Sequence, residues 1–216
     1  MTIIGINGSP RKKWNTATLL TNALLGTASK GADTELVHLY DLDYKGCISC
    51  FACKTIDSQY NGRCAVKDGL SPLLKKIEDE ADAIILGSPV YFGTMTGEMR
   101  SFIERLLFAP LVYTQPPRSA FPRKIRTGII YTMNVTEENS AERGYGVMFN
   151  STEATFRMIL GAAETFSCYD TYQFPDYSKV VMEYADPVKK AERREKVFPD
   201  DCRKAFEFGC RFASKA

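Results

Sequence analysis

Residues 2–16 read TIIGINGSPRKKWNT, and this stretch sets the fold that the rest of the chain follows. The run Ile3-Ile4-Gly5-Ile6 is apolar at successive positions instead of alternating, which is typical of a central strand covered by helices on both faces. A loop containing glycine and proline follows and leads into a helical pattern over residues 16–29. The stretch therefore predicts a strand, a loop and a helix, the first unit of a parallel α/β sheet.

The same alternation of short β-branched runs and longer helical patterns continues along the chain. It predicts further strands and helices. The strands are expected at 34–39, 83–88, 127–133 and, with a weaker pattern, 164–174, and the helices at 70–80, 97–107, 151–160 and 199–215. Five strands with covering helices predict a flavodoxin-like, doubly wound parallel sheet of order 2-1-3-4-5. We expect one domain over residues 1–216, with a cysteine-rich loop at 46–68 and a C-terminal helical extension from about residue 187.

Composition is that of an ordinary folded domain, with 44% hydrophobic residues, 25% charged residues and a net charge of +2. A basic cluster alternates with acidic residues and predicts a solvated helix face, so we expect no nucleic-acid binding. The cluster consists of Lys189, Lys190, Arg193 and Arg194. No apolar run approaches the roughly 18 residues that span a bilayer, and no export-signal pattern is present. We therefore expect no membrane association and a cytoplasmic location.

Four of the chain's seven cysteines lie within residues 47–64. Cys47, Cys50 and Cys53 are each separated by two residues, and Cys64 follows after ten more. In a reducing compartment such a group favours a metal or redox site over a disulfide framework. Thiolate ligands suit Zn²⁺ or an iron-sulfur cluster. Four ordinary reduced thiols are the alternative that the spacing leaves open.

The loop after the first strand has the features of an anion site. Backbone N–H groups at a helix start favour negative charge, and Ser9, Asn15 and Thr16 add side-chain donors. A phosphomonoester fits these donors. The loop lacks the glycine patterns of dinucleotide and nucleotide-hydrolase sites, so we expect no conventional NAD or ATP site. The alternative is a simple capped helix start with solvated basic residues.

A second loop, residues 88–97, reads SPVYFGTMTG and follows the strand at 83–88. In the order 2-1-3-4-5 the first and third strands flank the switch point, so both loops should face one ligand. Tyr91 and Phe92 can pack beside a flat ring, and Gly93 lets the backbone approach its edge. Taken alone, the two aromatics would be read as core. Surface ion pairing is expected for the charged residues of the next helix, Glu98, Arg100, Glu104 and Arg105.

Taken together, these residues resemble the NAD(P)H-dependent FMN reductase family. The resemblance covers about residues 1–135. It rests on Gly8-Ser9-Pro10-Arg11 with Asn15-Thr16, and on Ser88-Pro89-Val90-Tyr91-Phe92-Gly93 with Thr96-Gly97. The cysteine spacing, with Ala65-Val66-Lys67-Asp68 after Cys64, is similar to the iron-sulfur flavoprotein branch, although the gap before Cys64 is longer than that branch usually has.

The resemblance implies an FMN-dependent oxidoreductase that passes electrons from NAD(P)H to a quinone, a flavin or another small acceptor. The alternative is an electron carrier in which a redox protein feeds a [4Fe-4S] cluster that exchanges single electrons with FMN. The flavin carries the chemistry, so no catalytic side chain is expected. A homodimer or tetramer is also implied.

The resemblance also assigns residues to each group. The FMN phosphate would lie on Ser9, Arg11, Asn15 and Thr16. The ring would lie on Pro89, Val90, Tyr91, Phe92, Gly93 and, by a looser match, Thr132. The cluster would be held by Cys47, Cys50, Cys53 and Cys64, which could instead hold Zn²⁺.

Overall fold

The computed structural model describes residues 1–213. Its centre is a parallel sheet of the strands β1 (Thr2–Asn7), β2 (Asp33–His38), β3 (Ala83–Tyr91), β7 (Arg126–Thr132) and β8 (Ala163–Cys168). Their order is β2-β1-β3-β7-β8. This confirms the predicted order 2-1-3-4-5 and the flavodoxin-like fold class.

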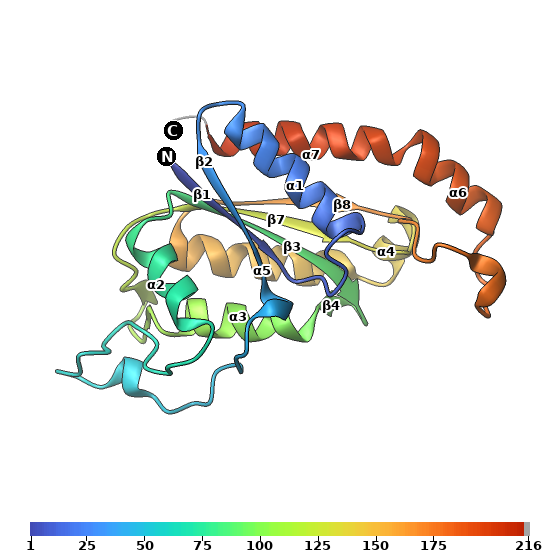
Figure 1. Ribbon diagram of the computed structural model, residues 1–216. Helices are drawn as coiled ribbons and strands as arrows, with labels where there is room; N and C mark the ends of the chain where they lie inside the picture. Colours follow the sequence, from blue (N-terminus) through green and yellow to red (C-terminus); the bar gives the residue numbers. More distant parts are fainter. Residues whose placement is uncertain (214–216) are drawn as a thin grey trace.

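Helices cover both faces of the sheet (Figure 1). On one face lie α1 (Asn15–Ala28) and α7 (Phe198–Phe212), and on the other α2 (Ser71–Asp79), α3 (Gly97–Phe108) and α5 (Tyr145–Leu160). Helices α1 and α7 approach closely because each has a glycine against the other's backbone: a Cβ on Gly209 would lie 1.8 Å from the carbonyl oxygen of Ala23, and one on Gly26 would lie 2.0 Å from that of Phe206. The helix expected at 199–215 is therefore present, although its last two predicted residues lie outside the described part.

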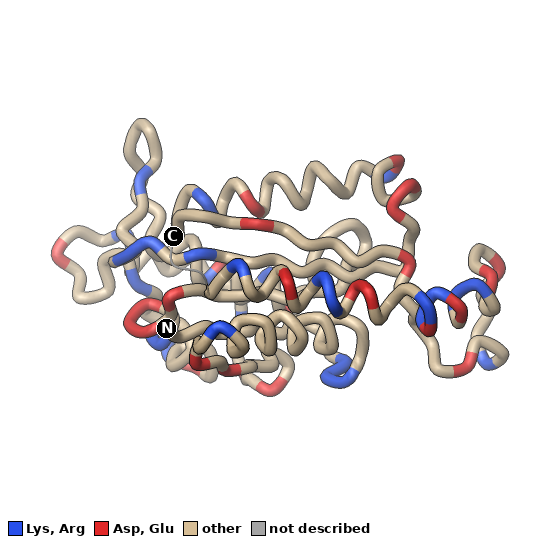
Figure 2. The backbone as a smooth tube through the Cα atoms, turned by 90° about the horizontal axis from the view of Figure 1, so that it is seen from above, with Lys and Arg blue, Asp and Glu red and all other residues tan. Residues whose placement is uncertain are grey.

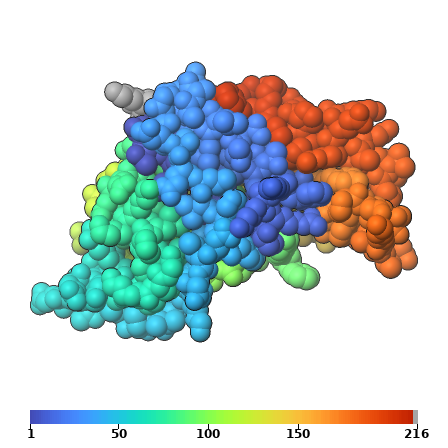
Figure 3. Space-filling model, viewed as in Figure 1, coloured from blue at the N-terminus to red at the C-terminus, as the bar shows by residue number. Residues whose placement is uncertain are grey.

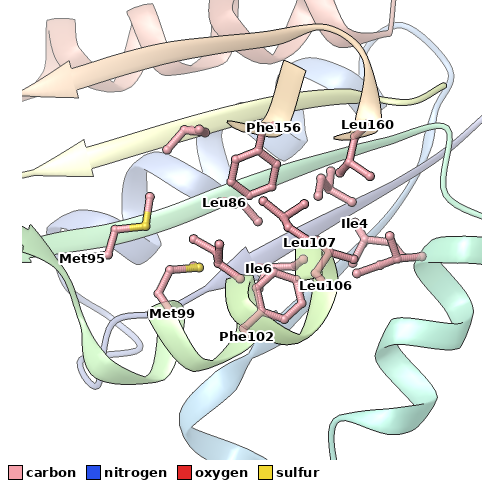
Figure 4. Packing of buried hydrophobic residues seen from close by; sticks show 14 of the residues in the cluster. Ile4, Ile6, Leu86, Met95, Met99, Phe102, Leu106, Leu107, Phe156 and Leu160 are labelled. Carbon is pink, nitrogen blue, oxygen red and sulfur yellow. The ribbon is translucent and has the colours of Figure 1, made fainter. Parts of the chain in front are cut away.

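The core explains why the strand sequences are apolar on both faces. Ile4, Ile6 and Leu86 point to one side and pack with Phe102 of α3 and Phe156 of α5 (Figure 4). Their sequence neighbours Ile3 and Ile85 point to the other side and pack with α1 and α7. Each such side chain, fully buried, stabilises the fold by about 1.5–3 kcal/mol.

Shorter elements complete the chain. They are β4 (Thr94–Met95), the small hairpin β5 (Leu111–Val112) with β6 (Arg118–Ser119), α4 (Glu137–Glu142), α6 (Pro187–Lys196) and the 3₁₀ turns η1 (Leu39–Asp41), η2 (Ala52–Lys54) and η3 (Tyr177–Lys179). Two predicted strands change length. β3 runs on to Tyr91 because β4 pairs with its end. β8 ends at Cys168 because the chain then turns away, with Asp170 at a φ of 52°.

The parallel topology gathers the loops after β1, β3, β7 and β8 at one edge of the sheet (Figure 1). The segment 46–68 lies elsewhere, beside α2 and the C-terminal half of α3, and projects from the body of the molecule (Figures 1 and 3). Among residues 1–213, no helix combines the length and apolar character needed to cross a bilayer.

Candidate functional site

The loop between β1 and α1 is shaped by its own side chains. The buried Asn7 accepts a hydrogen bond from the Ser9 N–H at 3.1 Å, and its amide lies 2.8 Å from Nδ1 of His38. The Ser9 hydroxyl accepts from the Arg11 N–H at 3.2 Å, which leaves the hydroxyl hydrogen for a ligand. No side chain caps the start of α1, and its first turn has no acidic residue. This start therefore has the character of an anion site.

The segment after β8 closes over this loop. The Arg11 guanidinium donates to the carbonyl oxygen of Gln173 at 2.5 Å, and the Asn15 amide donates to that of Tyr172 at 2.8 Å. The indole N–H of Trp14 donates to the same Tyr172 oxygen at 3.0 Å. In Figure 3 the dark blue first loop lies directly beside this orange segment. Arg11 and Asn15 are thus already anchored, with most of the five Arg11 donors left over.

The loop after β3 is a tight hairpin. Val90 and Tyr91 pair with Met95 and Thr94 across β4. The two turn residues, Phe92 and Gly93, have φ values of 50° and 80°, as the primed turns of two-residue hairpins require. Phe92 is fully exposed at the tip. The hairpin is joined to the first loop because the Thr96 hydroxyl, which caps α3, donates to the carbonyl oxygen of Gly8 at 2.7 Å.

Between these loops lies an open cavity of about 310 Å³. It contains eight of the ten residues that the sequence assigns to FMN, whereas Phe92 and Gly93 do not line it. The lining residues are Ser9, Arg11, Trp14, Asn15, Thr16, Pro89, Val90, Tyr91, Thr132, Met133, Asn134, Thr171 and Gln173. The buried hydroxyls of Thr16 and Thr132 lie 2.7 Å apart, so one of their two hydrogens is left for a ligand.

Two acceptors in this cavity lack partners. Oδ1 of Asn134 and Oε1 of Gln173 are buried and receive no hydrogen bond from the described residues. Buried polar atoms are nearly always hydrogen-bonded, so the cavity suits a ligand that brings N–H or O–H groups. Gln173 is not in the predicted set. It lies near the carboxyl end of the strand predicted at 164–174, and that position could have indicated it, because the carboxyl ends of parallel strands share one edge.

The four loop cysteines line a cavity of their own. Cys47, Cys50, Cys53 and Cys64 line one small cavity of about 20 Å³ next to α3, and all four are free thiols. Across residues 1–213, no three His, Cys, Asp or Glu side chains are grouped closely enough to hold a metal ion. The donor chemistry and the shared cavity suit an iron-sulfur cluster, which attaches each thiolate to a different iron atom. A single Zn²⁺ needs its sulfurs at about 2.3 Å from one centre, and the cysteines among the described residues are not grouped that closely.

Helix α3 anchors this loop at several points. The Glu104 carboxylate accepts from the Cys47 N–H at 3.2 Å. Lys54, next to Cys53, donates to carbonyl oxygens at the end of α3 and just beyond, with Ala109 at 3.0 Å and Phe108 and Leu111 also in contact. Burial lowers the pKa of Lys54, and the nearby thiols oppose that shift.

Arg105 is the innermost of these anchors, with a side chain that is only 1% exposed. The expectation of surface ion pairing is wrong here, because Arg105 faces inward along α3 and pairs with Asp68. Burial would raise the pKa of Asp68, but the hydrogen bonds and charge of Arg105 hold it below its ordinary value.

The basic cluster of α6 is a solvated face only in part, because Lys189 is exposed but Lys190 is buried. Lys190 is 4% exposed and donates to the carbonyl oxygen of Asn134 at 2.7 Å and to Asp170. Arg194 donates to Oδ1 of Asn15 at 2.8 Å. The prediction of a solvated face is wrong for Lys190 and Arg194, because charge alternation cannot reveal that α6 folds back against the β1–α1 loop. Over the described chain, Lys and Arg are interspersed with Asp and Glu (Figure 2).

Solved structures share this fold over nearly the whole chain. An NAD(P)H:quinone oxidoreductase from Methanothermobacter marburgensis is 13% identical with a TM-score of 0.70, covering 97% of this chain and 98% of that one. An FMN-dependent NADH-azoreductase from Bacillus anthracis, in complex with FMN, is 14% identical with a TM-score of 0.65, covering 99% of this chain and 100% of that one. At these identities the likeness establishes the fold.

Sequence relatives match about half of the chain. An iron-sulfur flavoprotein of Methanocaldococcus jannaschii is 42% identical over 105 residues, which is 49% of this chain and 51% of the relative. An iron-sulfur flavoprotein of Archaeoglobus fulgidus is 39% identical over 105 residues, 49% of this chain and 48% of the relative. The chain thus spans about half the length of the curated relatives it matches.

The family model of the NADPH-dependent FMN reductases matches residues 1–134, which include both crevice loops and the cysteine window. The match covers well over half of the chain and agrees with the fold and with the resemblance read from the motifs. The chain belongs to the NADPH-dependent FMN reductase family.

Proposed function

We propose that the chain is an FMN-dependent oxidoreductase that accepts electrons from NAD(P)H and passes them to a quinone, a flavin or another small acceptor. The observation that carries this proposal is the cavity at the carboxyl edge of β1 and β3, which joins an uncapped helix start to two unpartnered buried acceptors. Family membership supports the same conclusion.

The cavity residues fit FMN by their donor and acceptor chemistry. The start of α1, with the free hydroxyl hydrogen of Ser9, the one left by the Thr16–Thr132 pair and the remaining donors of Arg11, would hold the phosphate. Pro89, Val90 and Tyr91 would offer apolar surface to the ring. Oδ1 of Asn134 and Oε1 of Gln173 would accept hydrogen bonds from the cofactor's N–H or O–H groups.

The bound flavin would supply hydride and single-electron chemistry. The chain's own contribution is to bind and orient: no carboxylate or imidazole is among the described residues that line the cavity. The side chains there are neutral apart from Arg11, which leaves them unsuited to moving a proton at neutral pH. Protons for the acceptor would therefore come from water, and the site remains open enough to admit it.

Titration of the flavin-free protein with FMN and with riboflavin, followed by flavin fluorescence, tests the binding site. Arg11→Glu should weaken FMN by about tenfold or more while leaving riboflavin, which lacks the phosphate, nearly unchanged. Lys12→Glu is the matched control, because Lys12 pairs with Asp41 and does not line the cavity. Equal losses for both variants, or for both ligands, would contradict the proposed phosphate site.

A second function is supported by the shared cavity of the four loop cysteines and by the names of the relatives. In it, Cys47, Cys50, Cys53 and Cys64 hold a [4Fe-4S] cluster that exchanges electrons with FMN and a redox protein. Anaerobic reconstitution should load iron and sulfide into the wild type and Cys202→Ala but not into Cys64→Ala. Iron bound equally by all three would contradict it.

Residues 1–216 would form one FMN-binding domain, and a homodimer or tetramer would be the working unit, which sedimentation of the flavin-loaded protein can test. A reducing, cytoplasmic setting fits the seven free cysteines. Flavin reduction by NADH and NADPH in turn would identify the donor, and failure of both would favour a protein donor.

A further inference from the structure

The guanidinium of Arg105 donates hydrogen bonds to several residues of the cysteine loop and its two ends. Its Nε–H donates to Sγ of Cys64 at 3.0 Å. One terminal nitrogen donates to the carbonyl oxygen of Lys45 at 2.9 Å and to the Asp68 carboxylate at 2.7 Å, and the other donates to the same carboxylate at 3.2 Å. The guanidinium thus joins the two ends of the loop, before Cys47 and after Cys64.

The sulfur is the weakest acceptor in this arrangement unless it carries negative charge. A buried guanidinium loses its hydrogen bonds to water and needs well-placed protein acceptors to replace them. The Asp68 carboxylate satisfies one edge, but a neutral thiol is only a weak acceptor. A thiolate, or a sulfur bound to iron, accepts a charge-assisted hydrogen bond of about twice the ordinary strength. The geometry therefore suits Cys64 as an anionic ligand.

A second trio of the same residue types shows the opposite arrangement. Arg193 donates to Asp201 at 2.7 Å and makes only a long hydrogen bond, at 3.9 Å, to Sγ of Cys168. There the thiol donates to the Asp201 carboxylate at 3.2 Å. Burial, with the Asp201 charge, raises the pKa of Cys168 to about 12. Cys168 is thus a protonated thiol acting as donor, whereas Cys64 is an acceptor.

We propose that Arg105 is a positioning residue for the cluster: its Nε–H holds the Cys64 sulfur in place and stabilises the negative charge that reduction adds, and Asp68 orients the guanidinium. This inference rests on the proposed cluster at the four cysteines. Hydrogen bonds to the ligand sulfurs are one of the features that set cluster potentials. Because an N–H that donates to a ligand sulfur favours the more negative, reduced state, losing that hydrogen bond lowers the midpoint potential.

The test is potentiometry of the reconstituted protein, with the cluster followed by EPR and visible absorption. Arg105→Lys keeps the charge but lacks the planar fork that reaches Cys64, Lys45 and Asp68 together. We expect its midpoint potential to fall and its cluster to be lost to a chelator several-fold faster than in the wild type. Arg193→Lys, the matched control beside Cys168, should leave both quantities unchanged.

A second variant guards against misfolding of the first. Asp68→Asn retains Arg105 and its Nε–H, so iron content should persist while the potential shifts less than in Arg105→Lys. An unchanged potential in Arg105→Lys, or an equal shift in Arg193→Lys, would overturn the inference alone. A wild type that binds no iron or sulfide would overturn the inference together with the proposed cluster, which distinguishes the two failures.

Discussion

The crevice and the cysteine loop are built on the two ends of the same helix, but by different means. At the start of α3, Thr96 caps the helix and joins the β3 hairpin to the first loop, so the crevice follows from regular elements. At its other end, Glu104, Arg105 and the final carbonyl groups hold an irregular loop through side chains. One site is thus fixed by topology, and the other by three charged side chains, Lys54, Glu104 and Arg105.

The largest effect should come from removing the buried anchor. Arg105→Met leaves Asp68 without its partner, and we expect a loss of about 3 kcal/mol in the free energy of unfolding. Arg11→Met, at the crevice, removes an exposed hydrogen bond and should cost less than about 1 kcal/mol. Urea unfolding of the flavin-free proteins measures both. Similar losses would erase the distinction between the two regions.

Lys54→Met should have the next largest effect. It removes the donor to the carbonyl oxygens of Phe108, Ala109 and Leu111, with an expected loss of about 2 kcal/mol. Hydrogen exchange should also speed up in residues 47–64 and leave the crevice loops unchanged. Faster exchange at the β3 hairpin as well would show that the loop and the crevice form one cooperative unit.

Acid should weaken the loop first. The folded-state pKa of Asp68 lies below its ordinary value of about 3.9, so its contribution is present above that value and is lost as the pH falls through the folded pKa. Unfolding measured between pH 7 and pH 3 should show a decline that is shallower in Asp68→Asn. The pKa of Asp200 is also lowered, but its ion pairs are exposed and screened by solvent. Asp200→Asn should therefore retain the wild-type profile. The same slope for Asp68→Asn and the wild type would contradict this assignment.

The smallest effect lies at the hairpin tip. Phe92 is exposed with a positive φ, which Asn adopts more readily in this type of turn. Phe92→Asn should therefore raise the unfolding free energy by about 1 kcal/mol. Because Phe92 does not line the cavity, FMN affinity should stay within about twofold. A marked loss of affinity would return Phe92 to the cofactor site, where the sequence placed it.

The sequence predicts the crevice well because its parts are local. The apolar strands, the strand order and the loops after β1 and β3 all follow from periodicity and topology, and eight predicted residues meet in one cavity. Phe92 and Gly93 depart from the cavity because they form the two-residue turn that β4 requires. The four loop cysteines line one cavity, but within residues 1–213 no three of them are grouped closely enough to hold a metal ion.

What the sequence could not provide are the long-range side-chain contacts. Gln173 and Arg194 reach the first loop from more than a hundred residues away in the chain. The inward direction of Arg105 depends on where the loop around Asp68 folds against α3. Such contacts leave no periodic signal, because a charged residue has the same letter whether it faces solvent or a buried partner.

The most direct test of the account is the cofactor content of the wild-type protein purified without oxygen. We expect the wild-type protein to contain bound flavin together with iron and acid-labile sulfide. Cys64→Ala should retain the flavin and lose the iron. Protein that cannot bind FMN under these conditions would contradict the central claim that the crevice is a flavin site. Flavin without iron would leave the crevice standing and remove the cluster from the cysteine loop.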